Sequence, residues 1–147
     1  FSAESSPPQP LPPPALPAPL CLVPRSTMTG STGKLPAMTY GEGTTWHDGD
    51  GATVGATLAF DSALTLKSFD VVGMYASNNN NGDCTSIRLV VDDSSGNNIW
   101  SWTGSLSYTS WNSWLTLYPN VAGATSMRIA SYPSVCYPSF DNFKRVC

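Results

Sequence analysis

The sequence is poor in charged residues, and no apolar run is long enough to cross a membrane. Charged residues make up 12% of the 147 residues, the formal net charge is −3, and the pI is near 4.8. Proteins that bind nucleic acids use basic patches to neutralise phosphates, so this charge balance argues against a nucleic-acid partner. A membrane-spanning helix needs roughly 18 or more apolar residues, and we therefore expect no membrane span.

The sequence also lacks the usual signs of catalysis. His47 is the only histidine and there is no Gly-x-Ser-x-Gly motif, so a Ser-His-Asp triad has weak support. Most of the acidic residues lie in turn-like segments, where Asp is favoured for local hydrogen bonds. A small polysaccharide-active enzyme that uses a carboxylate pair is a third-ranked alternative, and we expect a protein that is not an enzyme.

The four cysteines fit no metal-binding or redox spacing, and they permit three disulfide pairings. The first residue is Phe1 and not methionine, as expected of a processed, secreted protein. In an oxidising compartment the cysteines would form disulfides. We predict the pairs Cys21–Cys147 and Cys84–Cys136, with a bond from Cys21 to a partner chain as the alternative.

Most of the 13 prolines lie in residues 1–24. Proline fixes φ and removes a backbone donor, so this segment predicts an extended polyproline II arm of about 3.1 Å per residue. Such an arm becomes ordered only when something holds it, for example the edge of a sheet in its own domain or in a neighbour's. The apolar residues that would anchor the arm are Leu11, Leu16, Leu20, Leu22 and Val23. The chain has no Asn-x-Ser/Thr sequon, so any glycan would be O-linked to Ser, Thr or modified Pro of this arm.

Beyond the arm, alternating apolar and polar residues predict β-strands. The clearest strand is residues 87–92, which a turn over residues 92–97 joins in a hairpin to residues 98–103. Further strands are expected around residues 56–60, 64–73, 115–118, 127–130 and 139–146, and no amphipathic helix is apparent. The predicted fold class is an all-β antiparallel sandwich of the jelly-roll type. The predicted organisation is an arm over residues 1–24, a flexible hinge over residues 25–34 and a sandwich over residues 35–147.

Several short runs carry a family resemblance. They are Thr-Thr-Trp at 44–46, Leu-Ala-Phe-Asp at 58–61, Ser-Ile-Arg-Leu-Val-Val-Asp at 86–92 and Phe-Asp-Asn-Phe-Lys-Arg-Val at 140–146. Over residues 40–147 the chain resembles the jelly-roll modules of secreted proteins. These include carbohydrate-binding modules and exported bacterial domains whose last strand carries an Asp-Asn pair. The resemblance implies a secreted, usually non-catalytic module, often with a structural calcium and sometimes with a sugar-binding face.

Two sets of residues are candidates for ligand sites. Asp48 and Asp50 lie on a Gly-rich loop that suits a hard cation, and by the resemblance Asp141 would join them around a structural calcium; a turn cluster without metal is the alternative. The second set is aromatic and would form a sugar platform together with Asn112 and Arg128. Its members are Trp100, Trp102, Tyr108, Trp111 and Trp114. Large aromatic residues are equally suited to a core or to a protein contact.

The sequence leads to two hypotheses of different class. The first is a secreted structural subunit that assembles with copies of itself into an extracellular filament or surface layer, through docking of the arm on a neighbour. It predicts that deletion of residues 1–24 leaves a folded monomer that does not polymerise. The alternative is a carbohydrate-binding module on a proline-rich linker, with a polysaccharide as partner. Neither hypothesis requires a cofactor.

Overall fold

The computed structural model describes residues 6–30, 37–38, 45–47, 57–73, 84–106, 114–131 and 138–147, and every strand pair among them is antiparallel. This confirms the predicted all-β antiparallel fold. The described residues contain no helix long and apolar enough to cross a membrane. The elements are β1 (Leu20–Leu22), the 3₁₀ turn η1 (Arg25–Thr27), β2 (Met28–Gly30), β3 (Ala37–Met38), β4 (Thr45–His47), β5 (Thr57–Gly73), β6 (Cys84–Asp92), β7 (Asn98–Leu106), β8 (Leu115–Leu117), β9 (Val121–Ser131) and β10 (Pro138–Val146).

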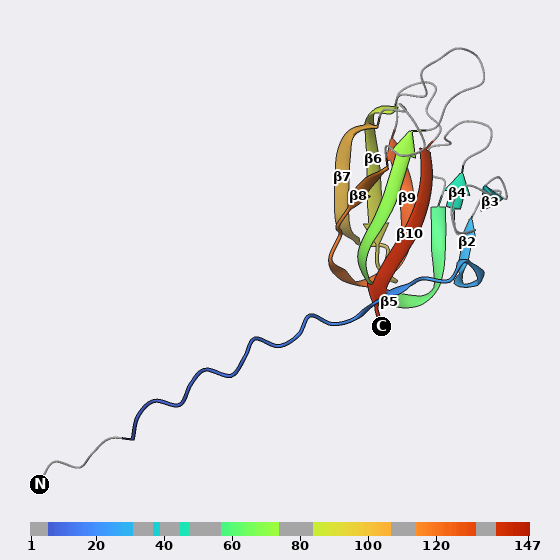
Figure 1. The fold of residues 1–147 in the computed structure, drawn as a ribbon. Helices are drawn as coiled ribbons and strands as arrows, with labels where there is room; N and C mark the ends of the chain where they lie inside the picture. The colour runs from blue at the N-terminus through green and yellow to red at the C-terminus, as the bar shows by residue number, and fades with distance from the viewer. Residues whose placement is uncertain are drawn as a thin grey trace, which may run out of the picture.

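The strands follow the order β3-β4-β10-β5-β9-β6-β7, with β1 paired to β10 and with β2 and β8 paired to β5 (Figure 1). The long strand β5 connects the two halves of the sandwich. Its first residues pair with β2 and β9, whereas its last residues pair with β8 and β10. The sequence predicted two separate strands here, because Asp61, Ser62 and Ala63 interrupt the apolar alternation. In the structure these three residues belong to one continuous strand and are exposed.

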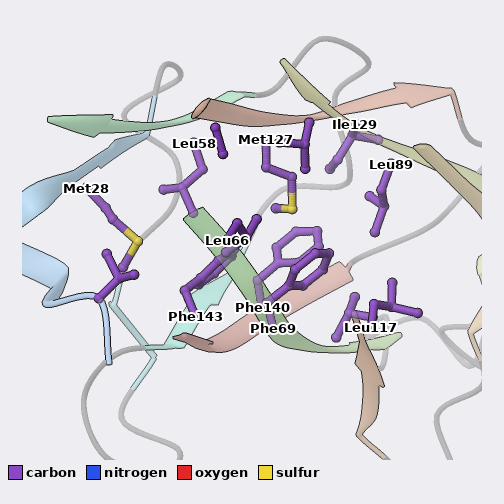
Figure 2. Close-up of a cluster of buried hydrophobic side chains, with 14 of the residues drawn as sticks. Met28, Leu58, Leu66, Phe69, Leu89, Leu117, Met127, Ile129, Phe140 and Phe143 are labelled. Atoms are coloured by element: carbon purple, nitrogen blue, oxygen red, sulfur yellow. The ribbon is translucent and has the colours of Figure 1, made fainter. Parts of the chain in front are cut away.

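The core lies between the two halves of the sandwich and is centred on three phenylalanines (Figure 2). Phe69 of β5 stacks on Phe143 of β10 with ring centroids 5.2 Å apart, and Phe140 lies 6.2 Å from Phe69. Aliphatic side chains of β5, β6 and β9, including Leu58, Leu89, Met127 and Ile129, belong to the same cluster. Fully burying such side chains contributes about 1.5–3 kcal/mol each.

A β-bulge in β10 explains how two phenylalanines three residues apart both face the core. Asp141 is opposite Asp70, but Lys144 is opposite Ser68, so β10 carries one extra residue over this stretch. The extra residue changes the side-chain alternation. Asn142 has φ +52°, a left-handed conformation that Asn tolerates better than most residues. The Asp-Asn pair of the closing strand is therefore the residue pair at the bulge.

The arm attaches to the chain's own domain. Strand β1 pairs with β10 through Leu20–Val146 and Leu22–Lys144, and Cys21 forms a disulfide with Cys147. The predicted Cys21–Cys147 bond is thus present in the structure. Of the second predicted pair, Cys136 lies outside the described residues.

The structure corrects the predicted boundary between arm, hinge and domain. Val23 is 2% exposed and belongs to the core, as does Met28 of β2. The predicted hinge residues 25–30 form η1 and β2, and β2 pairs with residues 58–60 of β5. Residues 25–30 are mostly small and polar, and Met28 is the one buried residue among them. Their sequence therefore carries no apolar alternation that would predict a strand.

Candidate functional site

Arg128 lies on the outer face of the sandwich, in the middle of β9. Its neighbours Met127 and Ile129 are both 2% exposed and point into the core. Because successive side chains of a strand face opposite sides, Arg128 points away from the core. Its register partners are Val90 of β6 and Thr57 of β5. Arg128 was predicted to contribute hydrogen bonds to a sugar-binding face, and this orientation is compatible with that role.

Two acceptors hold the Arg128 guanidinium in a fixed orientation. Arg128 Nε donates to Asp92 Oδ2 at 2.7 Å, and Nη2 donates to Asn98 Oδ1 at 3.1 Å. The Arg128 side chain is 34% exposed and that of Asp92 is 12% exposed. The Nη1 group and the second Nη2 hydrogen are not used by these two bonds, so the planar group presents further donors on the outer face. We name these three residues the Arg128 cluster.

Asp92 is the most enclosed member of the Arg128 cluster. Its Oδ1 is buried and accepts no hydrogen bond from the described residues, while Thr125 donates to its backbone oxygen at 3.1 Å. A buried carboxylate needs a compensating cation, and Arg128 is the cation that the structure places beside it. The ion pair therefore both connects β6 to β9 and orients the guanidinium.

The turn between β6 and β7 positions Asn98. Asp93 Oδ1 accepts from the backbone N–H groups of Ser95 and Asn97, both at 2.9 Å, and Gly96 has φ +79°. The hydrogen bond from the Asn97 backbone is the largest cause that lowers the pKa of Asp93, and the Asn97 side chain and the Ser95 backbone lower it further. Asn98 follows this turn directly and lies opposite Asp92 in the hairpin. The predicted turn over residues 92–97 is thus confirmed.

The predicted aromatic platform is only partly described. Trp100 packs edge-on against Phe69 with centroids 5.9 Å apart, and both Trp100 and Trp102 pack on the core. The indole of Trp102 also lies against the backbone of Gly104 and occupies the space that a Cβ at this position would need. Trp114 is half-buried just before β8. Tyr108, Trp111 and Asn112 lie outside the described residues.

The residues predicted for calcium are likewise divided. Asp48 and Asp50 lie outside the described residues, and Asp141 is 6% exposed at the β10 bulge. Asp141 Oδ1 accepts from the Asn142 backbone at 2.7 Å, and Asn142 Nδ2 donates to Asp70 Oδ2 at 2.9 Å. Thr116 donates to the other oxygen of Asp70 at 2.7 Å. These bonds stabilise the bulge, and within the described ranges no three His, Cys, Asp or Glu residues form a metal-binding group. A structural calcium stays a prediction.

The predicted assembly residues fall into two groups. Leu11 and Leu16 are 92% and 91% exposed on the extended part of the arm. Leu20 and Leu22 lie on β1, which pairs with the chain's own β10, and Val23 is buried in the chain's own core. Only Leu11 and Leu16 are therefore fully available to a neighbouring molecule.

Sequence reasoning missed Asp92 and Asn98 as partners of Arg128. The hairpin signal indicated that residues 92 and 98 flank a turn, and this places the two residues opposite each other. The distance from Arg128 in sequence is 36 residues for Asp92 and 30 for Asn98. No local pattern specifies that β9 lies beside β6, so only the fold brings Arg128 to this turn.

The described strands form an antiparallel β-sandwich, a fold that lectin modules of known structure share. No family model matches the sequence, and no curated protein matches it. Solved structures do match in three dimensions, which is how the shared fold is recognised.

One similar structure is a Streptococcus pneumoniae fucose-binding module. It has a TM-score of 0.51 and 10% sequence identity, over 81% of this chain and 89% of that chain. Another is a histidine mutant of the lectin-binding domain of lectinolysin in complex with Lewis b. Its TM-score is 0.52 and its identity 9%, over 86% of this chain and 98% of that chain. At these identities the likeness shows the shared fold, in agreement with the fold-level resemblance seen in the sequence.

Proposed function

We propose that this protein is a non-catalytic carbohydrate-binding module that acts outside the cytosol. The observation that carries the proposal is the Arg128 cluster: a guanidinium fixed by Asp92 and Asn98 with further N–H donors on the outer face. A guanidinium held in one plane loses little conformational entropy when it binds sugar oxygens, so it is suited to recognition. The similar structures are modules that bind fucose or were solved with Lewis b, which supports a sugar as the ligand.

The proposed location rests on the disulfide. Disulfides persist in oxidising compartments and are rare in the cytosol. The Cys21–Cys147 bond therefore supports a secreted protein. O-linked glycans on the arm are a further prediction, and intact-mass analysis of native material would detect them.

A glycan array with two matched variants tests the proposed function. Arg128→Lys keeps the positive charge but removes the planar fork, and we expect it to weaken binding of a hit glycan by about tenfold or more. Arg88→Lys is the control, because Arg88 is exposed on the neighbouring strand β6 and is not part of the cluster. Absence of binding to any glycan by the intact domain at millimolar concentration would contradict the proposal, as would equal losses in both variants.

The filament hypothesis is retained as the second candidate because of one observation. Leu11 and Leu16 are apolar and over 90% exposed on an arm that extends away from the sandwich (Figure 1). Apolar side chains in this position are available to a partner. Size-exclusion chromatography with light scattering, on the full chain and on a chain that lacks residues 1–19, would separate the candidates. Concentration-dependent assembly that disappears on truncation supports the filament, and a monomer in both cases excludes it.

A further inference from the structure

A pocket lies where the arm joins the sandwich, away from the Arg128 cluster. Its volume is about 120 Å³. Val23, Phe60 and Leu64 supply apolar side chains, and Asp61, Ser62 and Arg145 supply polar ones. The pocket is built by the end of the arm, the middle of β5 and the end of β10. We name it the Arg145 pocket.

Arg145 is the unusual feature of this pocket. The residue is mostly buried, and its Nε is buried without a hydrogen-bond partner among the described residues. Asp61 is exposed on the same pocket, yet the described structure contains no ion pair between the two side chains. A buried guanidinium nitrogen without a hydrogen-bond partner is unfavourable, because its lost hydration is not replaced.

The polar and apolar sides of the pocket together indicate the chemistry of its ligand. The guanidinium of Arg145 matches a carboxylate, with which Arg forms paired hydrogen bonds. The carboxylate of Asp61 and the hydroxyl of Ser62 can accept hydrogen bonds from ligand hydroxyls. Phe60 and Leu64 offer apolar surface for the C–H groups of a ring. A ligand with one carboxylate, several hydroxyls and an apolar face can pair with Arg145, with the two hydrogen-bond acceptors and with the apolar side chains at the same time.

We propose that the Arg145 pocket binds the carboxylated unit of an acidic saccharide, with the carboxylate on Arg145 and hydroxyls on Asp61 and Ser62. The choice of a saccharide rests on the proposed function, whereas the choice of an anionic ligand rests on Arg145 alone. Residues 6–19 of a second copy's arm are a poorer occupant. Residues 6–19 contain no acidic side chain, so this stretch leaves Arg145 without an anion.

Titration with three probes tests the inference, using the full chain and NMR or calorimetry. The probes are glucuronate, its neutral counterpart glucose, and acetate. We expect glucuronate to bind at least tenfold more tightly than either of the others. Equal binding of glucose and glucuronate overturns the proposal, and equal binding of acetate and glucuronate reduces the pocket to an anion site and also overturns it.

Variants assign the binding to this pocket. Arg145→Met removes the charge at similar length, and we expect it to weaken glucuronate binding at least tenfold, whereas Arg88→Met on β6 should change it less than twofold. Ser62→Phe, which fills the pocket from an exposed position, should give a similar loss and serves as a second variant if Arg145→Met does not fold. Unchanged glucuronate binding in a folded Arg145→Met protein overturns the proposal.

The sugar site at the Arg128 cluster and the acidic-sugar site at the Arg145 pocket can be refuted independently of each other. Arg128→Lys should weaken glycan binding at the Arg128 cluster by about tenfold or more and leave glucuronate binding at the Arg145 pocket intact. Loss of glucuronate binding in Arg128→Lys, with retention in Arg145→Met, would refute the Arg145 pocket and support the Arg128 cluster. Glucuronate binding that depends on Arg145, without any array hit that depends on Arg128, would support the Arg145 pocket and refute the Arg128 cluster as a sugar site.

Discussion

The two halves of the arm behave differently, and their proline content differs as well: residues 6–19 contain eight prolines and residues 20–24 contain one. Residues 6–19 are exposed and extended and project from the sandwich (Figure 1). From Leu20 onward the same chain pairs with β10, forms a disulfide and buries Val23. The difference lies in what each half has available as a partner. The half with few prolines pairs with a sheet edge, forms a disulfide and buries a side chain in the core, as expected because proline limits strand pairing.

The largest expected effect comes from two truncations on either side of this boundary. Removal of residues 1–24 deletes β1, the disulfide and Val23, and should lower the free energy of unfolding by about 5 kcal/mol or more. Removal of residues 1–19 should change it by no more than about 0.5 kcal/mol. Urea denaturation of both chains measures the difference. Equal stability of the two would show that the boundary is misplaced, and would restore the sequence-based expectation that residues 1–24 are dispensable for folding.

The disulfide alone should account for most of that difference. It closes a loop with a sequence separation of 126 residues, and for a loop of this length the loss of unfolded-state entropy contributes about 4–5 kcal/mol. The double variant Cys21→Ala, Cys147→Ala should therefore melt at a markedly lower temperature. The variant is preferable to a reducing agent, since reduction would act on every disulfide of the chain. A melting temperature within a few degrees of the original would refute this assignment.

A smaller effect is expected from single truncations of one side chain in each half. Val23→Ala removes buried methyl groups and should lower the free energy of unfolding by about 1–2 kcal/mol. Leu16→Ala removes a larger side chain that is 91% exposed, and it should have almost no effect on the monomer. Chemical denaturation compares the two. A larger loss for Leu16→Ala would show that the free half of the arm packs on something in solution.

The smallest effect concerns a segment that is exposed, like the free half of the arm, but ordered by its own hydrogen bonds. The lowered pKa of Asp93 means that its charged form is favoured in the folded state. Its contribution is therefore present above the ordinary pKa of 3.8 and disappears as the pH falls through the lower, folded-state pKa. Asp93→Asn should be slightly less stable than the original at neutral pH, and the difference should disappear as the pH falls through the lowered, folded-state pKa of Asp93. A difference in stability that does not depend on pH would argue against the charge as its cause.

The local sequence patterns predicted the main strands well, but they did not predict which distant strands each segment pairs with. The alternation over residues 87–92 and the turn that follows gave β6, the hairpin and β7 correctly, because both signals are local. Residues 20–30 were assigned to arm and hinge, because short strands of small and polar residues carry little periodic signal. Their place in the sandwich depends on pairing with residues far away in the sequence, such as Val146 and Phe60.

The candidate sites show the same limit. Trp100 and Trp102 were correctly expected on one face of a strand, but alternation does not say which face is buried, and both pack on the core. Arg128 was identified as a polar residue of a potential sugar site without its partners. Arg145 drew no attention in the sequence, because its significance is the missing partner and the pocket beside it, which only the packed structure defines.

The Cys21–Cys147 bond joins the first strand of the domain to its last described residue. A mechanical pull applied between the arm and Cys147 would therefore pass through this covalent bond and not through the strands. The sandwich would carry no load, and it would stay folded under forces that extend the arm. A domain clamped in this way can hold a ligand while its tether is under tension, for example in flow, and reduction of one bond would transfer the whole load to the β-sheet.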